Sequence, residues 1–72
     1  MKHSINSELL QEKIQESGLK LGYISKEMNL SSYGLGKKIK NESEFKVSEM
    51  YKLCELLCLS DKERDAIFLP TV

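Results

Sequence analysis

The sequence contains few of the residues that build metal and cofactor sites or that interrupt helices. Its 72 residues include no tryptophan, one proline, one histidine and two cysteines. The proline, Pro70, is close to the last residue, so the body of the chain is free of this helix breaker. Cys54, Cys58 and His3 cannot provide the four ligands of a structural zinc site at any familiar spacing. We therefore expect no metal and no cofactor, two thiols that are buried or half-buried, and no catalytic role for His3.

Neither sign of charge is in excess, and long hydrophobic runs are absent. The chain has 11 lysine and arginine residues and 11 aspartate and glutamate residues, so its formal net charge is zero. A neutral total excludes the simple argument that a strongly basic protein binds nucleic acid. No apolar run approaches the ~20 residues of a membrane span, and the first residues lack the apolar stretch of a signal peptide. These features predict a cytoplasmic protein with no membrane partner.

The length of the chain allows one small domain. A chain of 72 residues is near the lower limit for an unaided hydrophobic core. The sequence shows no paired carboxylates in a pocket-forming context, no phosphate-binding loop and no nucleophile beside a base, and so small a domain leaves little concavity. We expect a single domain over residues 1–72 with frayed tails at 1–6 and 69–72, no enzymatic activity and no small-molecule substrate.

Capping residues and apolar spacing predict three helices in the first forty residues. Asn6 or Ser7 can cap a helix that runs to residue 17, where Gly18 stops it. A second helix runs from about residue 21 to residue 28 and is followed by Asn29 in the left-handed region. Ser31 can cap a third helix. In these helices apolar residues recur three or four positions apart, as expected when one face is buried.

Two further helices follow a polar loop at residues 41–44. Phe45 and Val47 are expected to lead the chain back into the core, and Ser48 can cap the fourth helix. Ser60 and Glu63 form the S-x-x-E pattern of a capping box and begin the fifth helix. No alternating strand pattern and no internal repeat occurs, so the fold class is predicted to be all-α, a bundle of five short helices. The residues expected in its core are Leu10, Ile14, Ile24, Met28, Leu30, Leu35, Ile39, Phe45, Met50, Leu53, Leu57 and Ile67.

Positive charge is concentrated in the middle of the chain. Residues 20–46 contain six lysines and three glutamates, whereas residues 47–72 contain three basic and five acidic residues. Lys37, Lys38 and Lys40 form a cluster within and just after the third helix. Binding to phosphate depends on such local cations rather than on the total charge, although a solvated helix face has the same composition.

The most informative segment is residues 24–39, with the sequence ISKEMNLSSYGLGKKI. It is typical of a helix, a sharp turn and a capped helix, with apolar residues at the spacing of a helix-turn-helix. The turn and third-helix start, Met28 to Gly36 with the triplet Gly34-Leu35-Gly36, resembles the lambda-repressor and Cro-like helix-turn-helix regulators of temperate phages. The resemblance continues through Asn41 and Glu44-Phe45 and covers roughly residues 7–68. It implies a lambda-repressor-like helix-turn-helix domain.

The resemblance assigns the reading of DNA to the start of the second helix and the exposed face of the third. Its members often have glutamine at two of these positions, where this chain has Leu21 and Ser32. A glutamine pairs with adenine through two hydrogen bonds, whereas leucine makes none and serine keeps one hydroxyl. Tyr33 either takes part in binding or packs between the helices. The candidate face for a partner or for DNA is Leu21, Tyr23, Ser32, Tyr33, Gly36 and Lys37, and the candidate contacts to phosphate or to an acidic partner are Ser31, Lys38 and Lys40.

Two functions fit the resemblance. The chain either binds operator DNA directly, as Cro-like proteins do, or acts as an antirepressor that pairs with the phage repressor in the host bacterial cytoplasm and blocks operator binding. Tyrosine suits a protein interface because it buries a large area and keeps a polar tip. The acids expected to face the basic DNA-reading surface of a repressor, near one end of the molecule, are Glu27, Glu42 and Glu44. We favour the antirepressor because positions that would read bases are apolar.

Overall fold

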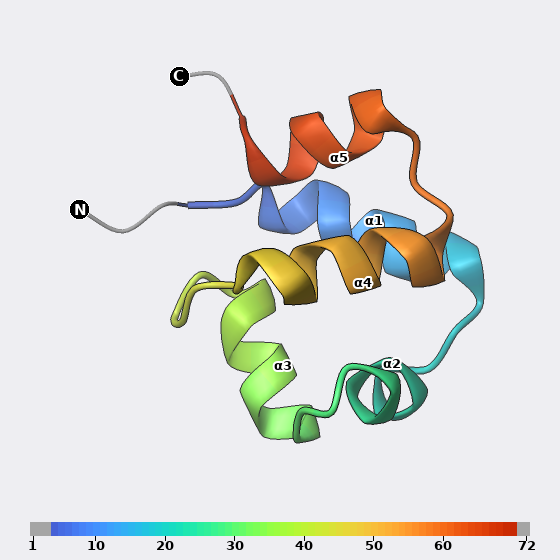
Figure 1. Ribbon diagram of the computed structural model, residues 1–72, viewed down its shortest axis with the longest axis vertical. Coiled ribbons are helices and arrows are strands. Elements are labelled where there is room, and N and C mark those ends of the chain that lie inside the picture. The colour runs from blue at the N-terminus through green and yellow to red at the C-terminus, as the bar shows by residue number, and fades with distance from the viewer. Residues whose placement is uncertain (1–3, 71–72) are drawn as a thin grey trace.

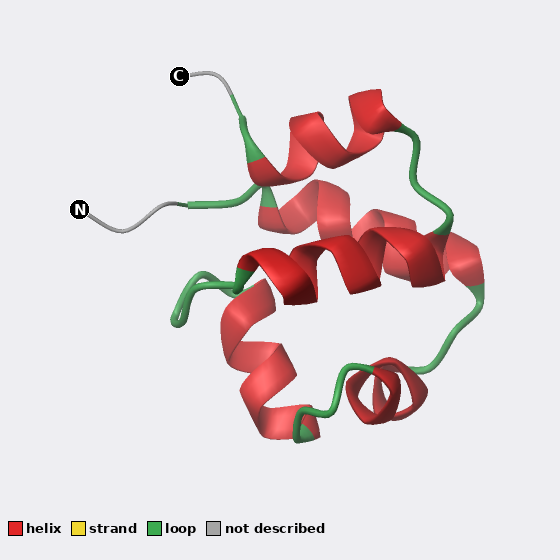
Figure 2. Ribbon diagram, viewed as in Figure 1, coloured by secondary structure: helices red, strands yellow, loops and turns green. Residues whose placement is uncertain are grey.

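Five α-helices and no strand occur in residues 4–70, the part of the chain that the computed structural model describes (Figures 1 and 2). The helices are α1 Ser7–Ser17, α2 Leu21–Glu27, α3 Ser32–Ile39, α4 Val47–Leu57 and α5 Asp61–Phe68. The predicted all-α bundle of five short helices is confirmed. None of the described helices is long and apolar enough to cross a membrane. His3 and the outermost residues of the expected tails, 1–3 and 71–72, lie outside the described residues.

Local hydrogen bonds begin and end α1 and α5 where the sequence predicts. Asn6 rather than Ser7 caps α1, since its side chain accepts a 3.1 Å hydrogen bond from a backbone N–H three residues on. Gly18 ends α1 with φ of 74°, in the left-handed region that glycine reaches without steric cost. The Ser60 hydroxyl accepts from the Glu63 N–H while the Glu63 carboxylate accepts from the Ser60 N–H, so the predicted capping box forms.

The start of α4 differs from the prediction. The N-cap residue is Lys46, so Ser48 lies inside the first turn and is not the cap. The Glu49 carboxylate accepts a 2.8 Å hydrogen bond from the Lys46 N–H, which satisfies a backbone donor at this end of the helix. Val47 is 66% exposed, because it begins the helix on the side away from the core, and the expectation that it enters the core is wrong.

α1 lies at the centre of the bundle. It packs against α3, α4 and α5, while α2 packs on α3. In Figure 1, α5 lies at one end of the molecule, and α2 and α3 lie at the other. The position of α3 therefore depends on α1 as well as on α2.

The core contains most of the residues that the apolar spacing predicts. The predicted residues that are buried are Leu10, Ile14, Ile24, Met28, Leu35, Ile39, Leu53, Leu57 and Ile67. Contrary to the prediction, Leu30, Phe45 and Met50 are only half-buried and pack against the edge of this core. The additional buried hydrophobic residues are Ile5, Cys54 and Phe68. The helical periodicity identifies the buried faces, but it does not show which residues lie at their margins.

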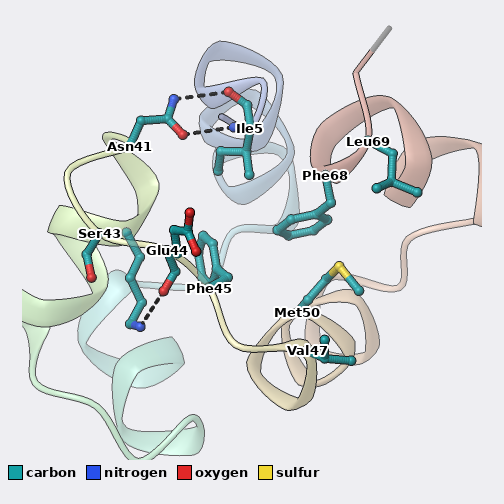
Figure 3. A pocket seen from close by; sticks show the side chains of 10 residues that line it. Ile5, Asn41, Ser43, Glu44, Phe45, Val47, Met50, Phe68 and Leu69 are labelled. Carbon is teal, nitrogen blue, oxygen red and sulfur yellow. Dashed lines mark hydrogen bonds between the residues drawn. The ribbon is translucent and has the colours of Figure 1, made fainter. Parts of the chain in front are cut away.

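The segment before α1 is held in place, which corrects the expectation that residues 1–6 are frayed throughout. The Asn41 side chain accepts a 2.8 Å hydrogen bond from the Ile5 N–H and donates a 3.1 Å hydrogen bond to the Ile5 carbonyl (Figure 3). The Asn6 N–H donates to the Ile67 carbonyl at 2.7 Å. Asn41 has φ of 65°, a left-handed conformation that asparagine adopts more readily than most residues. These bonds fix residues 5 and 6 against the loop after α3 and the end of α5.

A hollow of about 280 Å³ lies beside this segment, between the loop after α3 and the end of α5 (Figure 3). Its apolar lining includes the half-buried Met50 and the exposed Val47 and Leu69. Phe45 and Phe68 meet edge to face inside it, with ring centroids 5.5 Å apart. This aromatic contact positions the loop that connects α3 to α4.

An ion pair between Lys13 and Glu63 connects α1 to α5. Lys13 Nζ lies 2.8 Å from Glu63 Oε2 and 3.5 Å from Glu16 Oε1. The hydrogen bond from Lys13 and the backbone hydrogen bond from Ser60 lower the pKa of Glu63 from 4.5 to about 2. Because the pKa is lower in the folded chain, the ionised carboxylate stabilises the fold above pH 4.5, and this contribution is lost as the pH falls to about 2.

We predict that Glu63→Gln makes the stability of the chain less dependent on pH in acid. The thermal midpoint of the wild type should fall between pH 4.5 and about 2, and that of the variant should fall less steeply because a neutral amide does not titrate. Circular dichroism melts at several pH values measure both slopes. Glu12→Gln, at an exposed position on α1, is the control, and equal slopes for Glu63→Gln and the wild type would contradict the prediction.

Candidate recognition face

The turn between α2 and α3 orients the two helices that carry the candidate residues. Asn29 has φ of 58°, in the left-handed region as predicted. The Leu30 N–H donates to the Ser25 carbonyl at 2.8 Å, which closes the turn. The Ser31 hydroxyl then accepts a 2.9 Å hydrogen bond from the Gly34 N–H and caps α3, also as predicted. The chain changes direction within residues 28–31, and α2 and α3 pack against each other.

Three large side chains of the candidate residues are exposed to solvent. Tyr33 is 76% exposed, Tyr23 49% and Leu21 47%. Tyr33 therefore does not pack between the helices and is available for contact with another molecule. Isolated exposed hydrophobic residues are common on protein surfaces, so their arrangement matters more than their exposure.

Two shallow hollows bring most of the candidate residues together around Gly36. One, of about 230 Å³, is lined by Ser32, Tyr33, Gly36, Lys37, Lys40 and Glu42. The other, of about 220 Å³, is lined by Gln11, Ile14, Gln15, Leu21, Gly36, Ile39 and Lys40. Gly36 and Lys40 belong to both hollows, so Leu21 and Tyr33 lie on either side of them. We name the surface formed by Leu21, Ser32, Tyr33, Gly36, Lys37, Lys40 and Glu42 the recognition face.

Tyr23 is the residue of the candidate face for a partner or for DNA that neither hollow includes. It follows Leu21 by two positions on α2, and side chains two residues apart on a helix do not face each other. The expected exposed patch therefore forms from Leu21, Tyr33 and the half-buried Gly36, with Tyr23 on a neighbouring part of the surface.

Lys37 and Lys40 are the cations of the recognition face. Lys37 Nζ lies 5.6 Å from the centroid of the Tyr33 ring, a distance at which the cation and the ring attract each other. Lys40 is exposed and is the C-cap residue of α3, where the helix dipole favours a positive charge. Glu42 is exposed in the same hollow. The charge of the face is therefore mixed rather than uniformly positive.

Lys38 is engaged within the molecule, which corrects its prediction as a contact for phosphate or an acidic partner. Its Nζ lies 3.0 Å from Glu49 Oε1 and donates a 2.8 Å hydrogen bond to the Glu44 carbonyl. The two charged side chains are only 12% and 11% exposed. Burial favours the neutral acid, but hydrogen bonds from the Lys46 N–H and Lys38 outweigh it and lower the pKa of Glu49. Lys38 thus connects α3 to the start of α4.

The serine hydroxyls of the turn also take part in internal contacts. Ser31 uses its oxygen as the helix cap, and it remains exposed at the start of α3. Ser32 Oγ lies 3.4 Å from Ser25 Oγ, and the buried Ser25 donates to the Gly22 carbonyl at 3.0 Å. The hydroxyl of Ser32 is therefore directed towards α2, which reduces its value as a reader of base edges.

The acids that we expect near one end of the molecule are separated by α3. Glu27 ends α2, whereas Glu42 and Glu44 follow α3. The eight residues of α3 span about 12 Å at the helical rise of ~1.5 Å per residue. Glu42 lines one of the two hollows of the recognition face, whereas Glu27 and Glu44 line neither.

Gln11 and Gln15 are residues of the recognition region that the sequence does not single out. They are exposed, lie one turn apart on α1 and border the hollow that contains Leu21 and Gly36. Their spacing is visible in the sequence, but it is also typical of any solvated helix face. Only the packing of α1 against α3 reveals their position.

The cysteines show the features of ordinary thiols. Both are free, and Cys54 is buried as expected, but Cys58 is exposed, so the expectation of a buried or half-buried thiol is wrong for Cys58. Burial raises the pKa of the Cys54 thiol, which makes it less reactive. Among the described residues, no group of three or more histidine, cysteine, aspartate or glutamate side chains is arranged to hold a metal ion.

No protein-family model, no curated protein and no solved structure matches this chain. Its function must therefore be inferred from its sequence and structure.

The two glycines of α3 differ in what surrounds them, and we predict different effects of alanine. A Cβ at Gly36 meets nothing within 4 Å, whereas a Cβ at Gly34 lies 3.1 Å from the Oγ of the capping Ser31. Gly36→Ala should raise the free energy of unfolding by about 0.5–1 kcal/mol through helix propensity. Gly34→Ala should gain less, or lose stability, because the capping hydroxyl must move. Urea denaturation compares the variants, and equal gains would contradict this account.

Proposed function

We propose that this chain is a lambda-repressor-like helix-turn-helix regulator of a phage lytic/lysogenic switch, and that it acts as an antirepressor. In this function α2 and α3 are the two helices of the motif. The recognition face binds the DNA-binding domain of the phage repressor and keeps the repressor off its operator. The activity is binding without catalysis. The observation that carries this proposal is the exposed Tyr33 and Leu21 on either side of the uncovered backbone at Gly36.

The polar groups of the face are poorly suited to reading base edges. Direct readout depends on side chains that form paired hydrogen bonds in the major groove. Leu21 and Gly36 have no such group, and the Ser32 hydroxyl is directed towards Ser25. Lys38 is unavailable for phosphate because it pairs with Glu49. This loss of readout and of one cation favours a protein as the primary target.

The same face is well suited to a protein surface of mixed polarity. Tyrosines often dominate interface energy because they bury a large area at a small entropic cost. Tyr33 is exposed, and Lys37 Nζ lies close enough to its ring for a cation–π contact. Lys40 and Glu42 provide one charge of each sign beside it. A repressor domain whose DNA-binding surface carries polar groups offers partners for the tyrosine hydroxyl.

Direct binding to operator DNA is the second candidate function. The observation in its favour is the exposed start of α3, where Ser31 caps the helix and the first backbone N–H groups lack partners within the helix. Lys37 and Lys40 on the same helix can contact phosphate. Such contacts position a protein on DNA but carry no sequence information.

We predict that Tyr33→Ala weakens binding to the repressor domain while the fold is retained. Loss of an anchoring tyrosine should cost about 1–2 kcal/mol, a factor of about 5–30 in affinity. Calorimetry against the DNA-binding domain of the repressor from the same phage measures this loss, and circular dichroism checks folding. Tyr51→Ala is the matched control because Tyr51 is 56% exposed on α4, and Lys62→Ala on α5 is a second control. A larger loss at either control would move the interface to α4 or α5.

We further predict weak and only mildly salt-dependent binding of the isolated chain to operator DNA. Each neutralised phosphate contributes about −0.9 to the slope of log affinity against log salt, so two lysines give a slope of about −2. Fluorescence anisotropy with labelled operator and scrambled DNA at several salt concentrations measures the slope and the specificity. Submicromolar, operator-specific binding at physiological salt would establish the Cro-like function instead.

A further inference from the structure

The hollow between α1 and α3 differs from the rest of the recognition face because its floor is apolar and concave. Ile14 and Ile39, both part of the buried core, reach its floor, and Leu21 lies at its side. Gln11 and Gln15 of α1 and Lys40 form its polar rim. We name this feature the Gly36 hollow. It joins the recognition face at Gly36 and Lys40, which also line the hollow beside Tyr33.

The opening of the Gly36 hollow depends on a glycine that the chain itself does not need there. Gly36 lies within α3, where glycine is less favourable than alanine by about 0.5–1 kcal/mol. A Cβ at this position would meet nothing within 4 Å, so no internal contact requires glycine. Gly34, in contrast, is close to the capping Ser31 hydroxyl. The absent side chain at Gly36 leaves backbone and apolar floor accessible to another molecule.

We propose that the Gly36 hollow is the anchor site of the complex and receives one branched aliphatic side chain from a helix of the repressor's DNA-binding domain. This proposal rests on the proposed antirepressor function and specifies how its face binds. The volume of about 220 Å³ suffices for such a side chain, since a cavity of ~150 Å³ holds a benzene ring. A side chain inserted into a pocket of this kind is the usual form of an interface hot spot.

The residues at the rim of the Gly36 hollow indicate which group of the partner would lie beside the inserted side chain. Lys40 is the charged residue of the lining, and it is exposed. The amide of Gln15 supplies a further hydrogen-bond donor, whereas Gln11 Nε2 already donates a 3.0 Å hydrogen bond to Ser7 Oγ. A repressor helix could carry an aliphatic side chain and, about one helical turn away, a carboxylate. The aliphatic side chain would pack on the apolar floor while the carboxylate pairs with Lys40. DNA offers phosphates to Lys40, but its backbone has no branched aliphatic group for the floor formed by Ile14 and Ile39.

Filling the hollow provides a direct test. In Gly36→Leu the chain's own side chain occupies the site, so affinity for the repressor domain should fall at least tenfold. Folding should be retained, because leucine has a higher helix propensity than glycine and the position is open. The matched control is Ala66→Leu, which adds the same side chain at an exposed position on α5 and should bind as the wild type does. Calorimetry measures affinity, and circular dichroism melts measure stability.

The charge of the rim is tested by two substitutions at one position. Lys40→Glu should weaken binding more than Lys40→Gln, since it places two negative charges together. Equal or stronger binding by Lys40→Glu would contradict the proposal that a carboxylate of the repressor helix lies beside Lys40. Intermolecular nuclear Overhauser effects in a methyl-labelled complex identify the occupant directly, and we expect them between Ile14 or Ile39 and an aliphatic side chain of the repressor domain.

The outcomes separate this inference from the function on which it rests. If the wild type binds the repressor domain and Gly36→Leu binds equally well, the anchor site is wrong while the antirepressor function stands. If the wild type does not bind the repressor domain at all, the function is wrong and the anchor site falls with it. If Gly36→Leu selectively abolishes operator binding instead, the hollow belongs to a DNA interface.

Discussion

The packing of α1 against α3, α4 and α5 is the constraint on which the rest of the structure depends. Leu10 is fully buried and Ile14 nearly so, and Lys13 on the same helix reaches Glu63 on α5. This packing sets the distance between α1 and α3, and that distance creates the Gly36 hollow. Core contacts therefore hold the helices that carry the recognition face, and a face built in this way is organised before a partner arrives.

The same packing directs polar groups near α3 into the molecule. Ser32 approaches Ser25, Ser31 caps α3, and Lys38 crosses to Glu49 at the start of α4. Each of these contacts stabilises the position of α3, and each makes a polar group of this region less available to another molecule. The contacts that hold α3 in place are therefore the same contacts that reduce the number of polar groups it offers to another molecule. A partner that recognises shape and apolar area loses little from this arrangement, whereas one that offers base edges loses most of its contacts.

Local signals predict the helices well, and long-range contacts explain the differences. Gly18, Asn29 and Ser31 mark helix ends through backbone preferences that act within a few residues, so they are legible in the sequence. The burial of Ile5 depends on Asn41, 36 residues away, and no local pattern reveals it. The ion pair of Lys38 is hidden for the same reason, since a lysine in a cluster has the composition of a solvated face. On the recognition face, the exposure of Tyr33 follows from helical periodicity, but the role of α1 in its border does not.

The mixed charge of the recognition face limits how a complex can gain affinity. A chain with zero net charge creates little long-range field, so association is not strongly steered. Lys40 and Glu42 lie in one hollow and partly cancel each other at a distance. Affinity must then come from a slow dissociation rate, which depends on close contact and on the exclusion of water. An exposed tyrosine beside a hollow with an apolar floor provides this kind of contact, and it does so without the positive field that would attract nucleic acid indiscriminately.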